Sequence, residues 1–413
     1  MEKTKFTTET YNDYITRTLD NLRNDELSSL EISTMNLFAK ENTLMHNFLS
    51  EMSRSNKKAL GKFVVYHDVA YMQRMLVMPD GHYVFQRSVP WDVGKKEQKT
   101  AAREVRDRNL EEFSDILVNL PARFYQTETD TNFWKKSASS HLFQHLAASH
   151  VKAAVKHNKN GSIETAIQTG ELSSASQQNN LSLTILNNKK AAKFVEKVIN
   201  PETKIGSNLF DVENIALNIN LAADYGNYGS PKSISYIHEL AETMINPSYK
   251  SPVVDNETAD AKPTSVILVS QYVPSGRILK ALRFAADPKN YGARVVVPLE
   301  PDDDYRRSEI GFKILDKHFA LHRGKHVLTP VRPISSHSKC LITAYDDGSL
   351  AMIFGSDNFD STSDRFYRNT ELSLCVNRVK KDENGYDMII SMLKKLVEER
   401  EIDQSEFDRI VKK

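Results

Sequence analysis

The stretch SHSKCLITAYDDGSLAMIFGSDNF, residues 336–359, decides how this chain is interpreted. A His-x-Lys triplet, His337 and Lys339, precedes two short apolar runs that are separated by the turn sequence DDG (346–348). The second run ends in the tetrapeptide GSDN (355–358). Apolar runs of this length, bounded by turn residues, predict two buried neighbouring strands with polar and basic side chains at their ends.

The first half of the chain carries a weaker copy of this pattern. In HVKAAVKHNKNGSIETAIQTGEL, residues 150–172, the pair His150 and Lys152 precedes a strand pattern. The tetrapeptide QTGE (168–171) begins sixteen residues after Lys152, and GSDN begins sixteen residues after Lys339. A third triplet, HNK (157–159), runs into Asn and Gly and indicates a polar turn. Two triplets with matched spacing to matched loops predict an internal duplication.

Strand and helix patterns alternate through both halves, which predicts an α/β fold of two similar lobes with buried, largely parallel sheets. We expect an N-terminal lobe at 1–247 with an insertion near 68–149. A region at 248–263 contains Pro, Ser and Asp without periodicity and is the expected linker. The C-terminal lobe is then expected at 264–413.

The composition excludes several classes of protein. Among 413 residues, 55 Lys and Arg balance 54 Asp and Glu, for a net charge of +1, which argues against a protein held to nucleic acid by bulk positive charge. Two cysteines, Cys340 and Cys375, are too few for a disulfide framework and are expected to be buried. With no apolar run of about 18 residues and no signal-like N-terminus, we expect a cytoplasmic protein.

The two triplets and their loops resemble the duplicated HxK…GSxN motif of the phospholipase D superfamily. The second copy, with His337, Lys339, GSDN and Glu371, is a good match, and the first copy is degenerate. The resemblance implies two phospholipase D-like lobes, packed as a pseudo-twofold dimer within a monomeric chain. It places one site at the interface between the lobes.

The resemblance also implies a phosphodiesterase that needs no metal or organic cofactor. A neutral histidine attacks phosphorus to form a phosphohistidine, and a second, protonated histidine donates to the leaving oxygen. Lysine and amide groups stabilise the charge that spreads over the phosphoryl oxygens. The first-copy histidine is the expected nucleophile. The catalytic residues carried over are His150, Lys152, His337, Lys339, Asn358 and Glu371, and the substrate-binding residues are Ser356, Thr169 and Glu171.

This sequence departs from the family pattern in both copies. The Asp often found five residues after the Lys is replaced by His157 and Ala344, as also occurs in the tyrosyl-DNA phosphodiesterase branch. We expect Glu371 to orient its own His337. The alignment of the two copies places Ser182 opposite Glu371, so His150 lacks an equivalent partner. We hypothesise that Glu171 supplies that carboxylate from the neighbouring loop.

The substrate stays open at this point. A glycerophospholipid is favoured, with hydrolysis or phosphatidyl transfer as the reaction and transient contact with a membrane surface. The first alternative is a nuclease or DNA-end-processing phosphodiesterase acting on nucleic acid. The second is a catalytically inactive pseudoenzyme that only binds phosphodiesters, which the degenerate first loop suggests.

Overall fold

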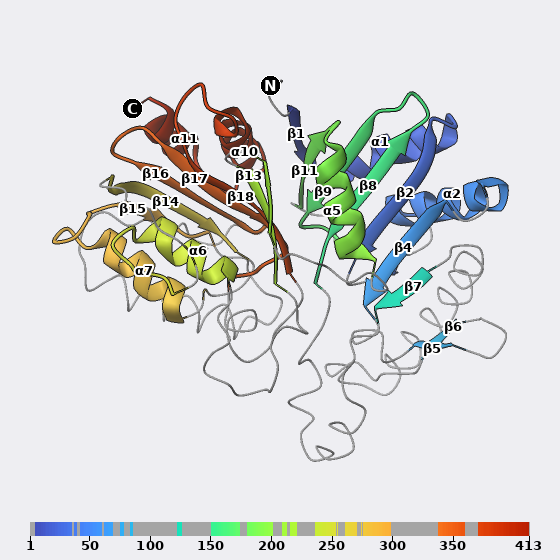
Figure 1. Ribbon diagram of the computed structural model, residues 1–413, viewed down its shortest axis with the longest axis horizontal. Coiled ribbons are helices and arrows are strands. Elements are labelled where there is room, and N and C mark those ends of the chain that lie inside the picture. The colour runs from blue at the N-terminus through green and yellow to red at the C-terminus, as the bar shows by residue number, and fades with distance from the viewer. Residues whose placement is uncertain are drawn as a thin grey trace, which may run out of the picture.

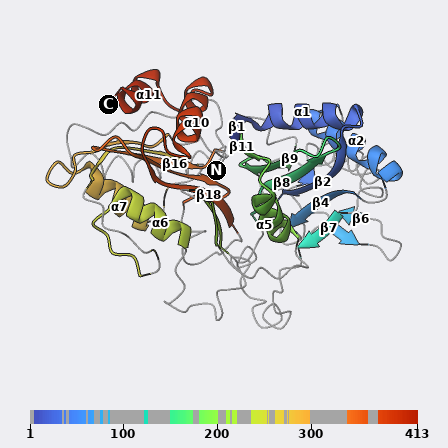
Figure 2. The ribbon, with the colours of Figure 1, turned by 45° about the horizontal axis from the view of Figure 1, so that its top comes forward.

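The computed structural model contains two α/β lobes that lie side by side (Figure 1 and Figure 2). The structure describes residues 5–34, 37–38, 42–59, 62–68, 75–77, 83–85, 122–125, 150–173, 180–200, 209–212, 215–220, 236–252, 254, 261–270, 274, 276–298, 338–359 and 371–412. Within these ranges no helix is long and apolar enough to cross a membrane.

The first lobe is built on a sheet with the strand order β1-β11-β9-β8-β2-β4-β7. Its strands are β1 (Lys5–Thr10), β2 (Leu27–Thr34), β4 (Phe63–Asp68), β7 (Ala122–Tyr125), β8 (Ala153–Asn158), β9 (Ile163–Gln168) and β11 (Leu181–Leu186). The short strands β3 (Leu37–Phe38) and β10 (Leu172–Ser173) pair with each other, as do β5 (Met75–Val77) and β6 (Tyr83–Phe85). Helices of this lobe are α1 (Tyr11–Arg23), α2 (Leu44–Ala59) and α5 (Lys189–Ile199).

The second lobe repeats this plan with the strand order β12-β13-β18-β17-β16-β14-β15. Its strands are β12 (Leu209–Val212), β13 (Ile215–Asn220), β14 (Pro263–Val269), β15 (Arg294–Val296), β16 (Cys340–Tyr345), β17 (Leu350–Gly355) and β18 (Glu371–Val379). Its helices are α6 (Tyr236–Ile245), α7 (Gly276–Ala286), α10 (Tyr386–Glu398) and α11 (Gln404–Val411). Because β13 pairs with β18, the chain enters the second sheet well before residue 247, the end expected for the first lobe.

The expectation of largely parallel sheets was wrong. Parallel pairs are β2 with β4, β4 with β7, and β14 with β15, whereas the other pairs of the two large sheets are antiparallel. A parallel pair needs a crossover connection, and α2 and α7 lie between β2 and β4 and between β14 and β15. The central strands are instead joined by tight turns, such as the one at Gly348, whose φ of 79° suits glycine.

The hydrophobic residues form layers that hold the lobes together. Buried side chains of α5 and α10 share one cluster with residues from both large sheets, including Val155 of β8 and Met352 of β17. Helices α1 and α2 pack on the other face of the first sheet, and α6 and α7 pack on the other face of the second. The order of layers is therefore helices, sheet, α5 with α10, sheet, helices, which is the duplicated α/β fold expected from the sequence.

This architecture brings the two predicted motifs to one place. His150 and Lys152 come just before β8, and Lys339 comes just before β16. The loops with Thr169 and Ser356 follow β9 and β17, the antiparallel partners of β8 and β16. In an antiparallel pair, one strand begins where its neighbour ends. Each triplet therefore lies beside the loop that follows the neighbouring strand.

Candidate active site

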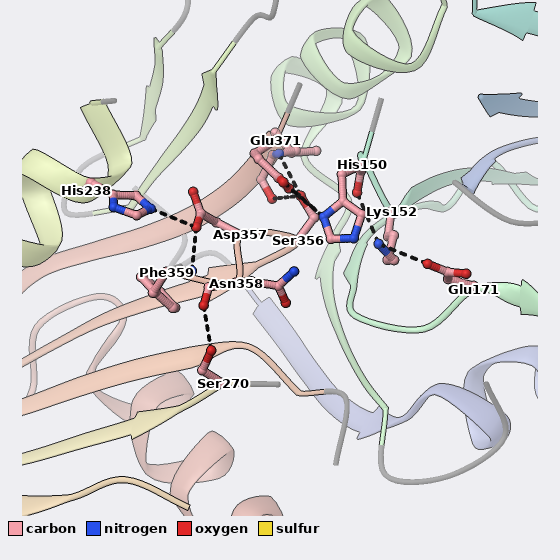
Figure 3. A network of polar contacts seen from close by, with 11 residues as sticks. His150, Lys152, Glu171, His238, Ser270, Ser356, Asp357, Asn358, Phe359 and Glu371 are labelled. Atoms are coloured by element: carbon pink, nitrogen blue, oxygen red, sulfur yellow. Dashed lines mark hydrogen bonds and ion pairs between the residues drawn. The ribbon is translucent and has the colours of Figure 1, made fainter. Parts of the chain in front are cut away.

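His150 is held in the described structure by a carboxylate from the other lobe. Its Nδ1 lies 3.0 Å from both Oε1 and Oε2 of Glu371, the first residue of β18 (Figure 3). The hydroxyl of Ser356 donates a hydrogen bond to the same carboxylate, and the backbone N–H of Leu372 donates to that hydroxyl at 3.0 Å. With Nδ1 donating to Glu371, Nε2 is the ring nitrogen left to react.

These contacts bear on two expectations about the orienting carboxylates. Glu371, which was expected to orient His337, contacts His150 of the opposite lobe, and its expected contact with His337 is not tested. At Nδ1 of His150 the carboxylate is Glu371 and not the hypothesised Glu171. Glu171 Oε1 lies 3.4 Å from the Nζ of Lys152. His337 itself lies outside the residues that the structure describes.

The surroundings of His150 favour the neutral form of its imidazole. Burial first, and then the positive charges of Lys152 and Lys339, hold the pKa of His150 well below its ordinary value. The carboxylates of Glu171 and Asp357 oppose this shift. A neutral imidazole with one nitrogen fixed by a carboxylate is the state that a nucleophilic histidine requires.

The two motif lysines are buried around this histidine. Lys152 is 1% exposed and Lys339 is fully buried, and both lower the pKa of His150. The contact between His150 and Glu371 shows that the two lobes meet here. Burial lowers the pKa of Lys152, while the carboxylates of Glu171 and Glu371 raise it. Buried ammonium groups are costly unless they are paired, so their retention here gives the site fixed positive charge.

The loops of the two lobes repeat one hydrogen-bond pattern. The N–H of Thr169 donates to the carbonyl of Leu181 at 3.0 Å, and the N–H of Ser356 donates to the carbonyl of Leu372 at the same distance. In return, Leu181 N–H donates to the Thr169 hydroxyl at 2.9 Å, and Leu372 N–H donates to the Ser356 hydroxyl. Thr169 and Ser356 are therefore structurally equivalent and cap the starts of β11 and β18.

This equivalence fixes the register of the duplication. The residue before Leu181 is Asn180, so Asn180, and not Ser182, occupies the place of Glu371. The hydroxyl of Thr169 lies 3.3 Å from Asn180 Oδ1, just as Ser356 contacts Glu371. Two residues after each hydroxyl residue, Glu171 stands where the second lobe has Asn358.

Sequence reasoning missed the residues that support the second loop. Asp357 Oδ1 lies 3.1 Å from Nε2 of His238 on α6 and accepts the N–H of Phe359 at 2.7 Å (Figure 3). The hydroxyl of Ser270 donates to the carbonyl of Asn358 at 2.5 Å. Asp357 occupies the variable third position of the GSxN motif, and its place inside the motif was the one available signal for it. Nothing in the sequence indicates that His238 or Ser270 contacts this loop.

The remaining polar groups complete the description of the site. Asn358 is buried, and its Oδ1 has no hydrogen-bond partner among the described residues. In the same ranges no three His, Cys, Asp or Glu side chains gather as a metal site. Cys340 and Cys375 are buried free thiols in β16 and β18, as expected.

Comparison with solved structures finds similar chains at low sequence identity. A phosphatidylserine synthase from Haemophilus influenzae aligns with a TM-score of 0.57 at 11% identity, over 96% of this chain and 86% of that one. The yeast tyrosyl-DNA phosphodiesterase aligns with a TM-score of 0.46 at 9% identity, over 91% of each chain. A polyphosphate kinase from Porphyromonas gingivalis aligns with a TM-score of 0.47 at 12% identity over 94% of this chain, which spans only 50% of the kinase.

No protein-family model matches the sequence, and no curated protein matches it by sequence. The similarity to the phosphatidylserine synthase, at 11% identity, concerns the fold and extends over both lobes. It agrees with the repeated loops, the two equivalent sheets and the helices shared between them. The chain therefore shares its duplicated, phospholipase D-like α/β fold with the phosphatidylserine synthase.

Proposed function

We propose that this protein is a phosphodiesterase that works through a phosphohistidine on His150. The observation that carries the proposal is the setting of this side chain: its Nδ1 is held 3.0 Å from the Glu371 carboxylate, two buried lysines lie beside it, and burial lowers its pKa. Such a group is a nucleophile for an anionic, electrophilic phosphorus rather than a structural histidine.

The proposed reaction has two steps. Nε2 of His150 forms a bond to phosphorus while the bond from phosphorus to the leaving oxygen breaks, and protonated His337 gives that oxygen its proton. Water, or an acceptor alcohol in a transfer reaction, then gives a proton to His337 and attacks phosphorus. The phosphorus–nitrogen bond breaks and neutral His150 is restored. Lys152, Lys339 and Asn358 are proposed to contact the phosphoryl oxygens.

A glycerophospholipid is the proposed substrate. The net charge of +1 supports it, because a nucleic-acid enzyme generally relies on excess positive charge. The one aligned structure with a TM-score above 0.5 among those compared above is named for phosphatidylserine synthesis, which agrees with this choice. Nucleic acid is the alternative substrate, and its cleavage is an outcome of the test below.

The test begins with the purified protein in EDTA, incubated with labelled phosphatidylcholine, phosphatidylglycerol and single-stranded DNA. Release or transfer of the lipid headgroup supports the lipid proposal, and cleavage of DNA alone moves the substrate to the nucleic-acid class. Failure to cleave any phosphodiester would contradict the proposed function and leave a binding protein.

Trapping the intermediate tests the assigned roles. Rapid denaturation during turnover is expected to leave an acid-labile, alkali-stable phosphohistidine that is lost in His150→Ala. His157→Ala is the matched control, because His157 belongs to the third triplet at the other end of β8 and pairs with Glu196 at 2.7 Å. Labelling that persists in His150→Ala would overturn the nucleophile assignment.

A further inference from the structure

Glu171 places a carboxylate where the second lobe has an amide. The matched hydrogen bonds of Thr169 and Ser356 put Glu171 and Asn358 at equivalent positions of the two loops. The amide and carboxylate groups themselves are similar in shape and differ by one full negative charge, and the side chain of Glu171 is longer than that of Asn358 by one methylene. The two half-sites therefore differ in charge at the same point of the duplicated fold.

This carboxylate acts directly on the phosphate-binding groups. Glu171 Oε1 lies 3.4 Å from the Nζ of Lys152, and the two side chains are 5% and 0% exposed (Figure 3). Little water is available there to screen the charge of Glu171 from a ligand that reaches Lys152. Because the positive charge of Lys152 is already balanced, the first half-site adds little attraction for a second negative charge on the ligand.

The charged groups around His150 also disfavour a second negative charge on the ligand. Among the described residues, the charges that act on His150 are the ammonium groups of Lys152 and Lys339 and the carboxylates of Glu171 and Asp357, while the Glu371 carboxylate contacts its Nδ1. A singly charged ligand is compatible with such a site, and each additional negative charge increases the repulsion from Glu171.

We propose that Glu171 selects the charge of the ligand, so that the site accepts a singly charged phosphodiester and rejects a doubly charged phosphomonoester. This inference rests on the proposed function and specifies the substrate class of the same site. It also gives Glu171 a role after chemistry. Hydrolysis converts the diester into a monoester, which gains its second charge near pH 6, and Glu171 then favours release of that product.

The experiment compares two probes that differ by one methyl group. Binding of dimethyl phosphate, singly charged throughout, and methyl phosphate, doubly charged at pH 8, is measured by calorimetry for wild type, Glu171→Asn and Glu171→Gln. At pH 8 both variants should raise affinity for methyl phosphate relative to dimethyl phosphate by about tenfold or more, since a tenfold change needs only ~1.4 kcal/mol. At pH 5, where both probes are singly charged, this difference should largely disappear.

Glu164→Gln is the matched control. Glu164 is also a largely buried carboxylate paired with a buried lysine of the same lobe, 2.8 Å from Lys156 Nζ, but it lies at the far end of β9. Its substitution should leave the ratio of the two affinities unchanged. Thermal unfolding checks all variants, and Glu171→Gln, which keeps the shape of the side chain, carries the test if Glu171→Asn does not fold.

The results separate this inference from the proposed function. An unchanged affinity ratio in a folded Glu171 variant overturns charge selection, even if wild type cleaves phosphodiesters. A shifted ratio in a protein that cleaves no phosphodiester supports charge selection and overturns the proposed enzymatic activity. An equal shift in Glu164→Gln would mean that overall charge, and not the position of Glu171, sets the preference, which also overturns the inference.

Discussion

Replacing Glu371 with Gln should remove most of the catalytic rate while leaving substrate binding nearly intact. The amide oxygen can still accept the hydrogen bond from Nδ1 of His150, so the change removes mainly the charge. That charge lies 3.0 Å from Nδ1 and is 1% exposed. When Nε2 bonds to phosphorus, the imidazole becomes positive, and the carboxylate stabilises this form more than the neutral one.

The size of the effect follows from Coulomb's law. Charge centres about 4 Å apart, at the effective dielectric constant of about 20 that reproduces measured protein pKa values, interact by about 4 kcal/mol. Since ~1.4 kcal/mol corresponds to a factor of ten in rate, Glu371→Gln should lower kcat by about 10³-fold. KM should change by less than about threefold, because the ground-state ring is neutral.

The assay is steady-state hydrolysis of bis(p-nitrophenyl) phosphate at pH 7, with circular dichroism to confirm folding. Ser356→Ala is the comparison: it removes a hydroxyl that donates to Glu371 but keeps the carboxylate. Its expected loss in kcat is about tenfold, the value of a hydrogen bond to a charged group. A loss below tenfold in folded Glu371→Gln, or a larger loss in Ser356→Ala, would refute the assignment of Glu371 as the carboxylate that stabilises His150.

Further predictions concern pH dependence, packing and thiol reactivity. Since the pKa of His150 is lowered, the nucleophile should stay neutral in mildly acidic solution, and kcat/KM should fall only below pH ~6.5 on the acid side of its pH profile. A fall in kcat/KM that begins above this pH would contradict the prediction. Gly355→Ala should lower the free energy of unfolding in urea by about 2 kcal/mol, because the new Cβ would clash with the carbonyl oxygen of Leu372 and lie 2.7 Å from the Cα of Ser373. An unchanged midpoint of urea unfolding would contradict this prediction. Burial raises the pKa of Cys375 to about 12 and that of Cys340 further. Dithionitrobenzoate at pH 8 should therefore react with neither thiol until the protein unfolds, and rapid reaction with the folded protein would contradict this.

Much of the fold follows from local patterns. The apolar runs on either side of an Asp-Gly turn predict the buried strands β16 and β17, and the helical spacing of apolar residues predicts α10. Strand β1 was missed because an edge strand that is half exposed has no apolar run. Strand direction was also missed, since the same apolar run suits a parallel or an antiparallel neighbour.

The site residues were easier to predict than their partners. The matched spacing of the two copies, together with the family resemblance, predicted His150 and Lys152 as site residues, because a duplicated motif limits where each copy can fall. The partner of His150 could not be identified in this way, since Glu371 comes from the other lobe. The choice of Ser182 as the equivalent of Glu371 was wrong by two residues. The hydrogen bonds that identify Asn180 instead depend on the geometry of the loop and leave no trace in the spacing.

The contact between the lobes also bears on which histidine becomes phosphorylated. The second lobe supplies His150 with the carboxylate of Glu371, whereas the equivalent position of the first lobe holds the amide of Asn180. A phosphorylated imidazole carries positive charge, which a carboxylate stabilises and a neutral amide stabilises far less. The two halves therefore offer unequal support for a covalent intermediate, and the half-site of His150 is the better supported. This argument favours His150 as the nucleophile independently of its order in the chain.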